Sequence, residues 1–284
     1  MDFNQAIQLQ TSSSTFINLN SVSSAVAPAT PVSGYAVESA GLGQSTIRGY
    51  VTENAQRDGV QAAEAFFGPR AVEISVAVFG STLGDFWDKI DALNGALDPY
   101  PAQFESDDGF RQLRFYSPTG ATSRHLYMFV RPSNLPSYSF NKNQSVGPSS
   151  KGFAANARVS FTAKDPRKIS VSETTVSIST GTTTIAYNGT YDYYPRLIVT
   201  ASGTSASYTL GSRTIGLSGL SSGTSYYIDH QTYTIRTGSF TGTLVPARID
   251  NTTTTGFGPI RPGGNIVLSG SVSDCSLIYR EAWL

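Results

Sequence analysis

Few residues of this chain have the side-chain types that catalysis or metal binding requires. The only histidines are His125 and His230, and the only cysteine is Cys275. Zinc sites are built from several imidazole or thiolate ligands, so these residues cannot form most of them without carboxylates. A single cysteine also excludes an intramolecular disulfide. Both histidines stand beside strand-like sequence, which favours a structural or exposed histidine over a ligand or general base.

Signatures of nucleophilic catalysis and of phosphate binding are weak or missing as well. The sequence has no G-x-G-x-x-G motif that would cradle a phosphate. Residues 219–223 match the spacing G-x-S-x-G, but they lie among serines and glycines that indicate turns rather than the strand-to-helix elbow that presents a serine nucleophile. The acidic pair Asp107-Asp108 precedes Gly109 between two strand-like segments, where Asp-Gly is usual turn chemistry. Asp229 and His230 are adjacent in the sequence. Because neighbouring side chains of a strand point to opposite faces, this adjacency does not indicate a catalytic pair. We therefore predict no enzyme activity, no cofactor and no metal site.

The composition favours a β protein that carries little charge. Charged residues make up 14% of the 284 residues, against about 25% in typical soluble domains. Exposed positions must therefore be filled mainly by Ser, Thr, Asn, Gln, Gly and Tyr, several of which suit strands better than helices. The formal net charge is zero, so nothing steers the chain toward nucleic acid or an anionic membrane.

The amino terminus shows no signal for secretion. Its first residues lack the basic segment and the apolar run of a signal peptide. No stretch reaches the roughly 18 apolar residues of a membrane span, and the single cysteine is compatible with folding in a reducing cytosol. Residues 1–34 mix short apolar runs with a Ser/Ala/Pro-rich stretch, which predicts an arm of one or two edge strands and a loop.

One segment of the first half has the clearest strand pattern in the chain. Val72, Ile74, Val76 and Val78 alternate with less apolar residues within 71–80. This period of two is typical of a β-strand with one buried face.

A single amphipathic helix is predicted directly after this strand. Ser81 or Thr82 is a suitable N-cap, and Pro99 ends the helix. Apolar residues recur at spacings of three and four, which places them on one stripe that packs on the adjacent sheet. We expect Trp87 to belong to this core stripe rather than to a binding surface. The stripe consists of Leu83, Phe86, Trp87, Ile90, Leu93 and Leu97.

A change in composition near residue 168 divides the chain. Before it lie the helix and further strand-like runs; after it Ser, Thr and Gly dominate, and short strands follow one another without a helix, as in a β-sandwich. We therefore predict a mainly β protein, with a β-rich domain and one helix at residues 1–168 and a β-sandwich at residues 169–284.

Further strands are expected throughout both domains. In the first domain, segments 102–105 and 112–116 form a predicted Asp-Gly hairpin. The other expected strands are 35–37, 45–51, 61–67, 126–130, 156–163, 176–178, 196–200, 206–210, 226–228, 232–236, 265–269 and 276–280.

Tyrosines are concentrated in the second domain and are its best candidates for contact with a ligand or another protein. Aromatic rings stack on sugar rings and also anchor protein interfaces. Three interpretations remain: ordinary exposed strand residues, a protein contact or a carbohydrate contact. The contact candidates are Tyr191, Tyr193, Tyr194, Tyr227 and Tyr233, and Tyr187 and Tyr226 belong to the same group.

Short motifs follow one another in a defined order along residues 34–284. In the first half, a turn at Gly59 precedes Pro69-Arg70, which opens the strong strand. After it come the helix and an Asp-Pro pair. The second half continues with Tyr194-Pro195, Ile228-Asp229, Pro262-Gly263-Gly264-Asn265, Tyr279-Arg280 and Trp283-Leu284, and the Asp-Pro pair is Asp165-Pro166. In their order and spacing these motifs resemble the distal tail proteins of siphophages, the phages with long non-contractile tails.

The resemblance implies a fold and a role. The first domain would be a hub domain, and the second a galectin-like β-sandwich. Six copies would form a ring in the virion, between the tail tube protein and the tail-tip hub proteins, after assembly in the host bacterial cytoplasm. DNA would pass through the ring as cargo, and the sandwich would serve as scaffold or hold receptor-binding proteins. Gly59, Pro69 and Arg70 are the residues that we associate with ring assembly.

Two other functions remain open at this point. The β-sandwich is also compatible with a carbohydrate-binding module that acts at a host cell surface and contacts its glycans. A hydrolase is a third interpretation, which would require a cleft with converging carboxylates.

Overall fold

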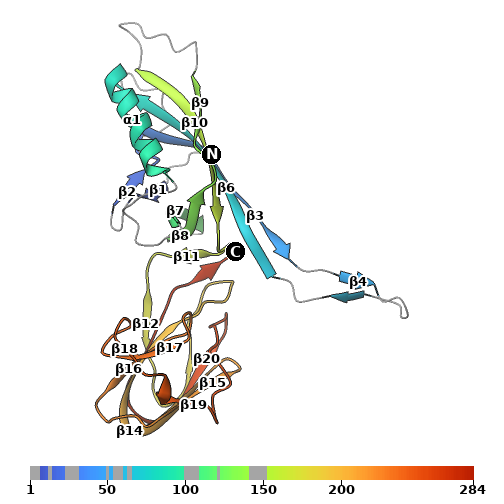
Figure 1. Ribbon diagram of the computed structural model, residues 1–284, viewed down its shortest axis with the longest axis vertical. Coiled ribbons are helices and arrows are strands. Elements are labelled where there is room, and N and C mark those ends of the chain that lie inside the picture. The colour runs from blue at the N-terminus through green and yellow to red at the C-terminus, as the bar shows by residue number, and fades with distance from the viewer. Residues whose placement is uncertain are drawn as a thin grey trace. The chain divides into compact units, whose positions relative to one another are not determined.

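The chain divides into two compact units, Met1–Pro166 and Arg167–Leu284 (Figure 1). Both are built mainly from strands, which confirms the predicted mainly β fold. The computed structural model describes residues 7–11, 15–22, 32–48, 51–53, 60–62, 66–98, 109–119, 122–140 and 152–284. No helix in these residues is long and apolar enough to cross a membrane.

The first unit is an antiparallel sheet covered by one helix. Its elements are β1 (Ile7–Gln10), β2 (Phe16–Asn18), β3 (Gly34–Arg48), β4 (Val51–Glu53), β5 (Val60–Ala62), β6 (Phe66–Gly80), α1 (Leu83–Ala96), β7 (Arg111–Thr119), β8 (Thr122–Pro132), β9 (Ser137–Phe140) and β10 (Phe153–Ala163). The sheet has the order β2-β1-β7-β8-β10-β6-β3, β9 pairs with β10, and β4 and β5 form a separate ribbon.

The predicted strand 71–80 lies within β6, the longest strand of this sheet together with β3. β6 pairs with β10 along one edge and with β3 along the other. Val72, Ile74, Val76 and Val78 are all buried, whereas Glu73 is exposed. The alternation read from the sequence therefore marks the core face of the sheet.

Helix α1 begins where the sequence predicts. Oγ1 of Thr82 accepts a hydrogen bond of 3.1 Å from the backbone N–H of Asp85, and the Asp85 carboxylate accepts one of 2.7 Å from the backbone N–H of Ser81. The first bond satisfies a donor that the first turn leaves unpaired, and the second ties the residue before the cap to the helix. The helix packs on β6 and β10 through Phe86, Ile90 and other buried residues.

The prediction that the whole apolar stripe belongs to the core is wrong at two positions. Trp87 is 48% exposed and Leu83 is 52% exposed. Each residue turns the helix by about 100°, so Trp87 lies beside the line of Phe86 and Ile90. Its ring packs 5.6 Å from that of Phe86 and 6.2 Å from that of the exposed Phe140.

The far end of the helix is held by a residue that sequence reasoning did not single out. Arg111, the first residue of β7, is only 1% exposed. Its Nη1 and Nη2 donate hydrogen bonds to the carbonyl oxygens of Ala96 and Asp98. A guanidinium at this place both pairs the last carbonyls and complements the negative end of the helix dipole.

The strand expected at 112–116 lies within β7. β7 forms a hairpin with β8, and its other edge pairs with β1. Segment 102–105 and the pair Asp107-Asp108 lie outside the described residues. β1 and β2 form the predicted strands of the amino-terminal arm at one edge of the sheet.

The second unit is the predicted β-sandwich. Its elements are β11 (Lys168–Ser170), β12 (Thr174–Ser177), β13 (Gly181–Thr184), β14 (Arg196–Leu210), β15 (Arg213–Ser218), β16 (Ser225–Asp229), β17 (Thr234–Thr237), β18 (Thr243–Leu244), the 3-10 turn η1 (Pro246–Arg248), β19 (Ile249–Asp250), β20 (Asn265–Tyr279) and β21 (Ala282–Trp283). Strands β14 and β20 pair along most of their length.

A bend in β14 and β20 lets one hydrogen-bonded sheet enclose its own core. The register between the two strands shifts between Thr200 and Ala206. Before the bend β14 pairs with β16, and after it with β15. Gly270 lies at the bend with φ +93°, and a Cβ there would lie 2.7 Å from Cα of Ala206. Leu197 and Leu210, from opposite sides of the bend, belong to the same buried core.

The junction of β6 and α1 provides a stability test. A Cβ at Gly80 would lie 2.3 Å from Cα of Phe86, whereas one at Gly95 would meet no atom within 4 Å. We expect Gly80→Ala to lower the free energy of unfolding by about 3 kcal/mol through overpacking. Gly95→Ala should raise it by about 0.5–1 kcal/mol because alanine favours helix. Urea denaturation measures both, and equal effects would contradict the tight junction.

Candidate functional site

The two histidines belong to different units. His230 is 1% exposed; its Nε2 lies 2.8 Å from the hydroxyl of Tyr208, and its Nδ1 lies 2.8 Å from the carbonyl oxygen of Gly258. Burial lowers the pKa of His230 to about 4, although the Gly258 hydrogen bond and Asp229 act in the opposite direction. The imidazole is therefore neutral at pH 7, and it holds strand and loop together. His125 is exposed on β8.

The single cysteine is unsuited to chemistry. Cys275 is 1% exposed within the core of the second unit, and burial raises the pKa of its thiol to about 12. A thiol in this state is not a nucleophile at neutral pH. Within the described residues, no group of His, Cys, Asp and Glu side chains is arranged to hold a metal ion.

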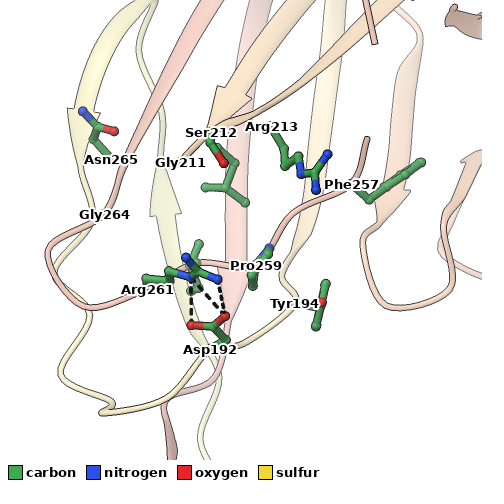
Figure 2. A pocket seen from close by; sticks show the side chains of 12 residues that line it. Asp192, Tyr194, Gly211, Ser212, Arg213, Phe257, Pro259, Arg261, Gly264 and Asn265 are labelled. Carbon is green, nitrogen blue, oxygen red and sulfur yellow. Dashed lines mark hydrogen bonds and ion pairs between the residues drawn. The ribbon is translucent and has the colours of Figure 1, made fainter. Parts of the chain in front are cut away.

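A pocket of about 260 Å³ in the second unit combines aromatic, apolar and charged side chains (Figure 2). It lies where the β14–β15 turn meets the loop before β20. The lining residues are Asp192, Tyr194, Leu210, Gly211, Ser212, Arg213, Phe257, Pro259, Ile260, Arg261, Gly264 and Asn265.

An ion pair forms one wall of this pocket. Nε of Arg261 lies 3.0 Å from both carboxylate oxygens of Asp192, and Nη2 lies 2.9 Å from Oδ2. The hydrogen bond to Asp192 is the main cause that raises the pKa of Arg261. Antiparallel backbone bonds between Tyr193 and Ile260, of 3.1 and 2.8 Å, bring the two chain segments together. The ion pair is thus positioned by backbone as well as by charge.

The opposite wall combines aromatic and polar groups. Phe257 packs edge-on against His230 at 5.3 Å and against Tyr233 at 5.5 Å. The backbone N–H of Gly258 lies 3.1 Å from Nδ1 of His230. Nη1 of Arg213 donates to the carbonyl oxygen of Thr255 at 3.1 Å. The loop that carries Phe257 is therefore anchored to the core by the buried histidine.

The structure brings together only part of the predicted tyrosine group. Tyr194 lines the pocket, and Tyr233, with φ +56° and 61% exposed, contacts it through Phe257. Tyr193 packs against the core of the unit and makes the backbone bridge to Ile260.

The remaining candidates lie outside the pocket lining. Tyr191 has the guanidinium of Arg167 over its ring, 5.9 Å from the centroid. Tyr227 on β16 packs edge-on against Phe240 at 5.1 Å.

The residues associated with ring assembly have different surroundings. Gly59 lies outside the described residues. Pro69 is half-buried in β6, and Arg70 is 8% exposed, so Arg70 is not the surface charge that an ordinary turn would present. Arg70 lies opposite Ser45 of β3 and Ala163 of β10. Among the described residues its Nε has no hydrogen-bond partner. An assembly role for these positions stays a prediction.

Asp192 and Arg261 are the site residues that the sequence analysis missed. They are far apart in the chain, and neither belongs to a motif with a known ligand. Composition offered a signal for Asp192. Acidic residues are rare after residue 168, and this one lies among the three tyrosines of residues 191–194.

The buried imidazole predicts a pH dependence of stability. The folded pKa of His230, about 4, lies below its ordinary value of 6.5, so the unfolded chain binds more protons between these values. The stabilisation is complete above pH 6.5 and is lost as the pH falls toward 4, by on the order of 3 kcal/mol in total. Urea denaturation followed by Trp283 fluorescence in a Trp87→Phe background measures this loss.

The control is His230→Gln, which retains a donor and an acceptor but does not titrate. Its stability should change much less between about pH 7 and pH 5, where carboxylates are still ionised. The same slope in both proteins would contradict the assignment to His230.

Comparison with known proteins finds solved structures of similar fold. No protein-family model and no curated protein matches the sequence. The SPP1 Dit protein (gp 19.1), described as a paradigm of the hub adsorption apparatus in phages that infect Gram-positive bacteria, matches with a TM-score of 0.66 and 15% identity over 99% of both chains.

Structures of the phage p2 baseplate in its activated conformation match more distantly. The calcium form has a TM-score of 0.50 at 10% identity, and the strontium form 0.51 at 9% identity, each over 98% of both chains. The chain therefore has, over its whole length, the fold of the SPP1 Dit protein: a helix-bearing β unit followed by a β-sandwich.

Proposed function

We propose that this protein is a structural subunit of the distal tip of a long, non-contractile phage tail. The observation that carries the proposal is the match to SPP1 Dit over 99% of both chains, which includes both units in the same order. A fold alone does not define a function. A match across two unrelated units in one chain is more specific than a match to a common sandwich, and it agrees with the motif order in the sequence.

The first unit has features that suit assembly with copies of itself. β3 is 15 residues long and pairs with β6 along one edge, and no strand among the described residues pairs with its other edge. Long unpaired edges invite pairing with another chain. Trp87 and Phe140 add an exposed aromatic surface next to α1. Head-to-tail contacts of this kind close into a ring when the rotation between copies allows it.

In this proposal six copies form a ring in the virion, assembled in the host bacterial cytoplasm. The ring lies between the tail tube protein and the tail-tip hub proteins and leaves a central channel through which DNA passes. The second unit is galectin-like and projects outward as scaffold or as a holder of receptor-binding proteins. The role is structural and requires neither catalysis nor a cofactor.

The oligomeric state of the purified protein tests the proposal. One chain has a mass of 30.3 kDa, so a closed ring of six copies has a mass of roughly 180 kDa. We expect light scattering after size exclusion to give this mass and negative-stain images to show rings. A protein that remains monomeric, also in the presence of the tail tube protein, would contradict the ring.

A truncation locates the interface within the chain. Removal of residues 167–284 leaves the first unit, with α1 and both long strands of its sheet. We expect this fragment to form rings of the same copy number. A monomeric fragment beside a ring-forming full chain would assign the contacts to the second unit.

A further inference from the structure

We propose that the pocket of the second unit binds a single neutral sugar ring through adjacent hydroxyl groups. This goes beyond the scaffold role proposed above and does not depend on ring assembly. The pocket combines a fixed carboxylate–guanidinium pair with aromatic and apolar side chains, a combination that suits the two chemical faces of a sugar.

The ion pair suits the hydroxyl groups of a sugar. A carboxylate has about four acceptor positions and a guanidinium has five N–H donors. The contacts between Asp192 and Arg261 use Nε and Nη2 of the arginine, and no hydrogen bond of Nη1 is found among the described residues. Side by side, the pair offers an acceptor and a donor to two neighbouring hydroxyls, each of which can donate and accept.

The remaining wall suits the C–H face of the ring. Tyr194, Phe257 and Pro259 contribute aromatic and apolar surface, while Ser212 and Asn265 add polar groups at the rim (Figure 2). Phe257 is held by its contacts with His230 and Tyr233. A rigid aromatic wall lowers the entropy lost on binding.

Size and charge narrow the ligand class. The volume of about 260 Å³ lies near the lower end of ligand pockets, about 300 Å³, and so admits one ring rather than an oligosaccharide. The lining carries one carboxylate, Asp192, and two guanidinium groups. Asp192 neutralises Arg261, and Arg213 donates a hydrogen bond to the carbonyl oxygen of Thr255. Because Asp192 repels an anion beside Arg261, we expect a neutral hydroxylated ligand to be favoured over phosphate. Because sugar hydroxyls exchange water for protein partners with little net gain, we expect a dissociation constant on the order of 1 mM.

Saturation-transfer NMR on the full-length protein tests the proposal. The probes are methyl α-D-glucopyranoside, methyl β-D-galactopyranoside and N-acetylglucosamine, each at about 10 mM, ten times the expected dissociation constant. We expect transfer to the ring protons of at least one probe. Inorganic phosphate at the same concentration should not displace it.

Two variants alter the proposed site in different ways, and a third variant serves as the control. Arg261→Ala deletes half of the ion pair at a side chain that is 70% exposed. Ser212→Trp fills the pocket from an exposed turn position. Both should lower the transfer at least fivefold. Tyr227→Ala removes a half-exposed tyrosine outside the pocket lining and should leave the transfer unchanged.

Each other outcome overturns the proposal. Absence of transfer to all three probes, transfer that persists in either pocket variant, or equal loss in Tyr227→Ala would mean that the pocket does not bind a sugar ring. Displacement by phosphate would instead assign an anion site to Arg213 and Arg261. Thermal unfolding of each variant verifies that it is folded.

Discussion

Each unit depends on one 15-residue strand whose backbone is hydrogen-bonded along both edges. β6 lies between β3 and β10, and β14 lies between β20 and the pair β15 and β16. A buried N–H or C=O without a partner costs as much as a lost hydrogen bond, so such a strand requires neighbours along its whole length. These neighbours then determine where α1 packs in the first unit and where the sheet bends in the second.

The need to pair backbone N–H and C=O groups also positions the pocket of the second unit. The β14–β15 turn brings Ser212 and Arg213 to its rim, and the backbone bridge of Tyr193 with Ile260 brings Asp192 next to Arg261. The buried His230 anchors the intervening loop. A site of this kind is held by main-chain bonds and one imidazole, so its side chains can change without loss of the fold.

This separation of fold from surface explains how 15% identity accompanies a whole-length match to SPP1 Dit. Alternating burial and edge pairing tolerate many apolar sequences of similar volume. In the proposed assembly, contacts with other proteins would depend instead on particular exposed groups, such as Trp87, Phe140 and the edge of β3 that pairs with no described strand. The differences that matter between such proteins therefore lie on their surfaces.

The sequence predicted the elements whose signal is local: the alternation of β6, the Thr82 cap, helix α1 and a second unit without an α-helix. It failed where the outcome depends on distant residues. Trp87 is exposed on α1 beside Phe140, and Arg111 is buried because its guanidinium pairs with carbonyl oxygens at the end of α1. Asp192 and Arg261 are 69 residues apart. Only the tertiary structure joins them, since electrostatic attraction and hydrogen bonding act over distances in space, whereas a sequence pattern records neighbours along the chain.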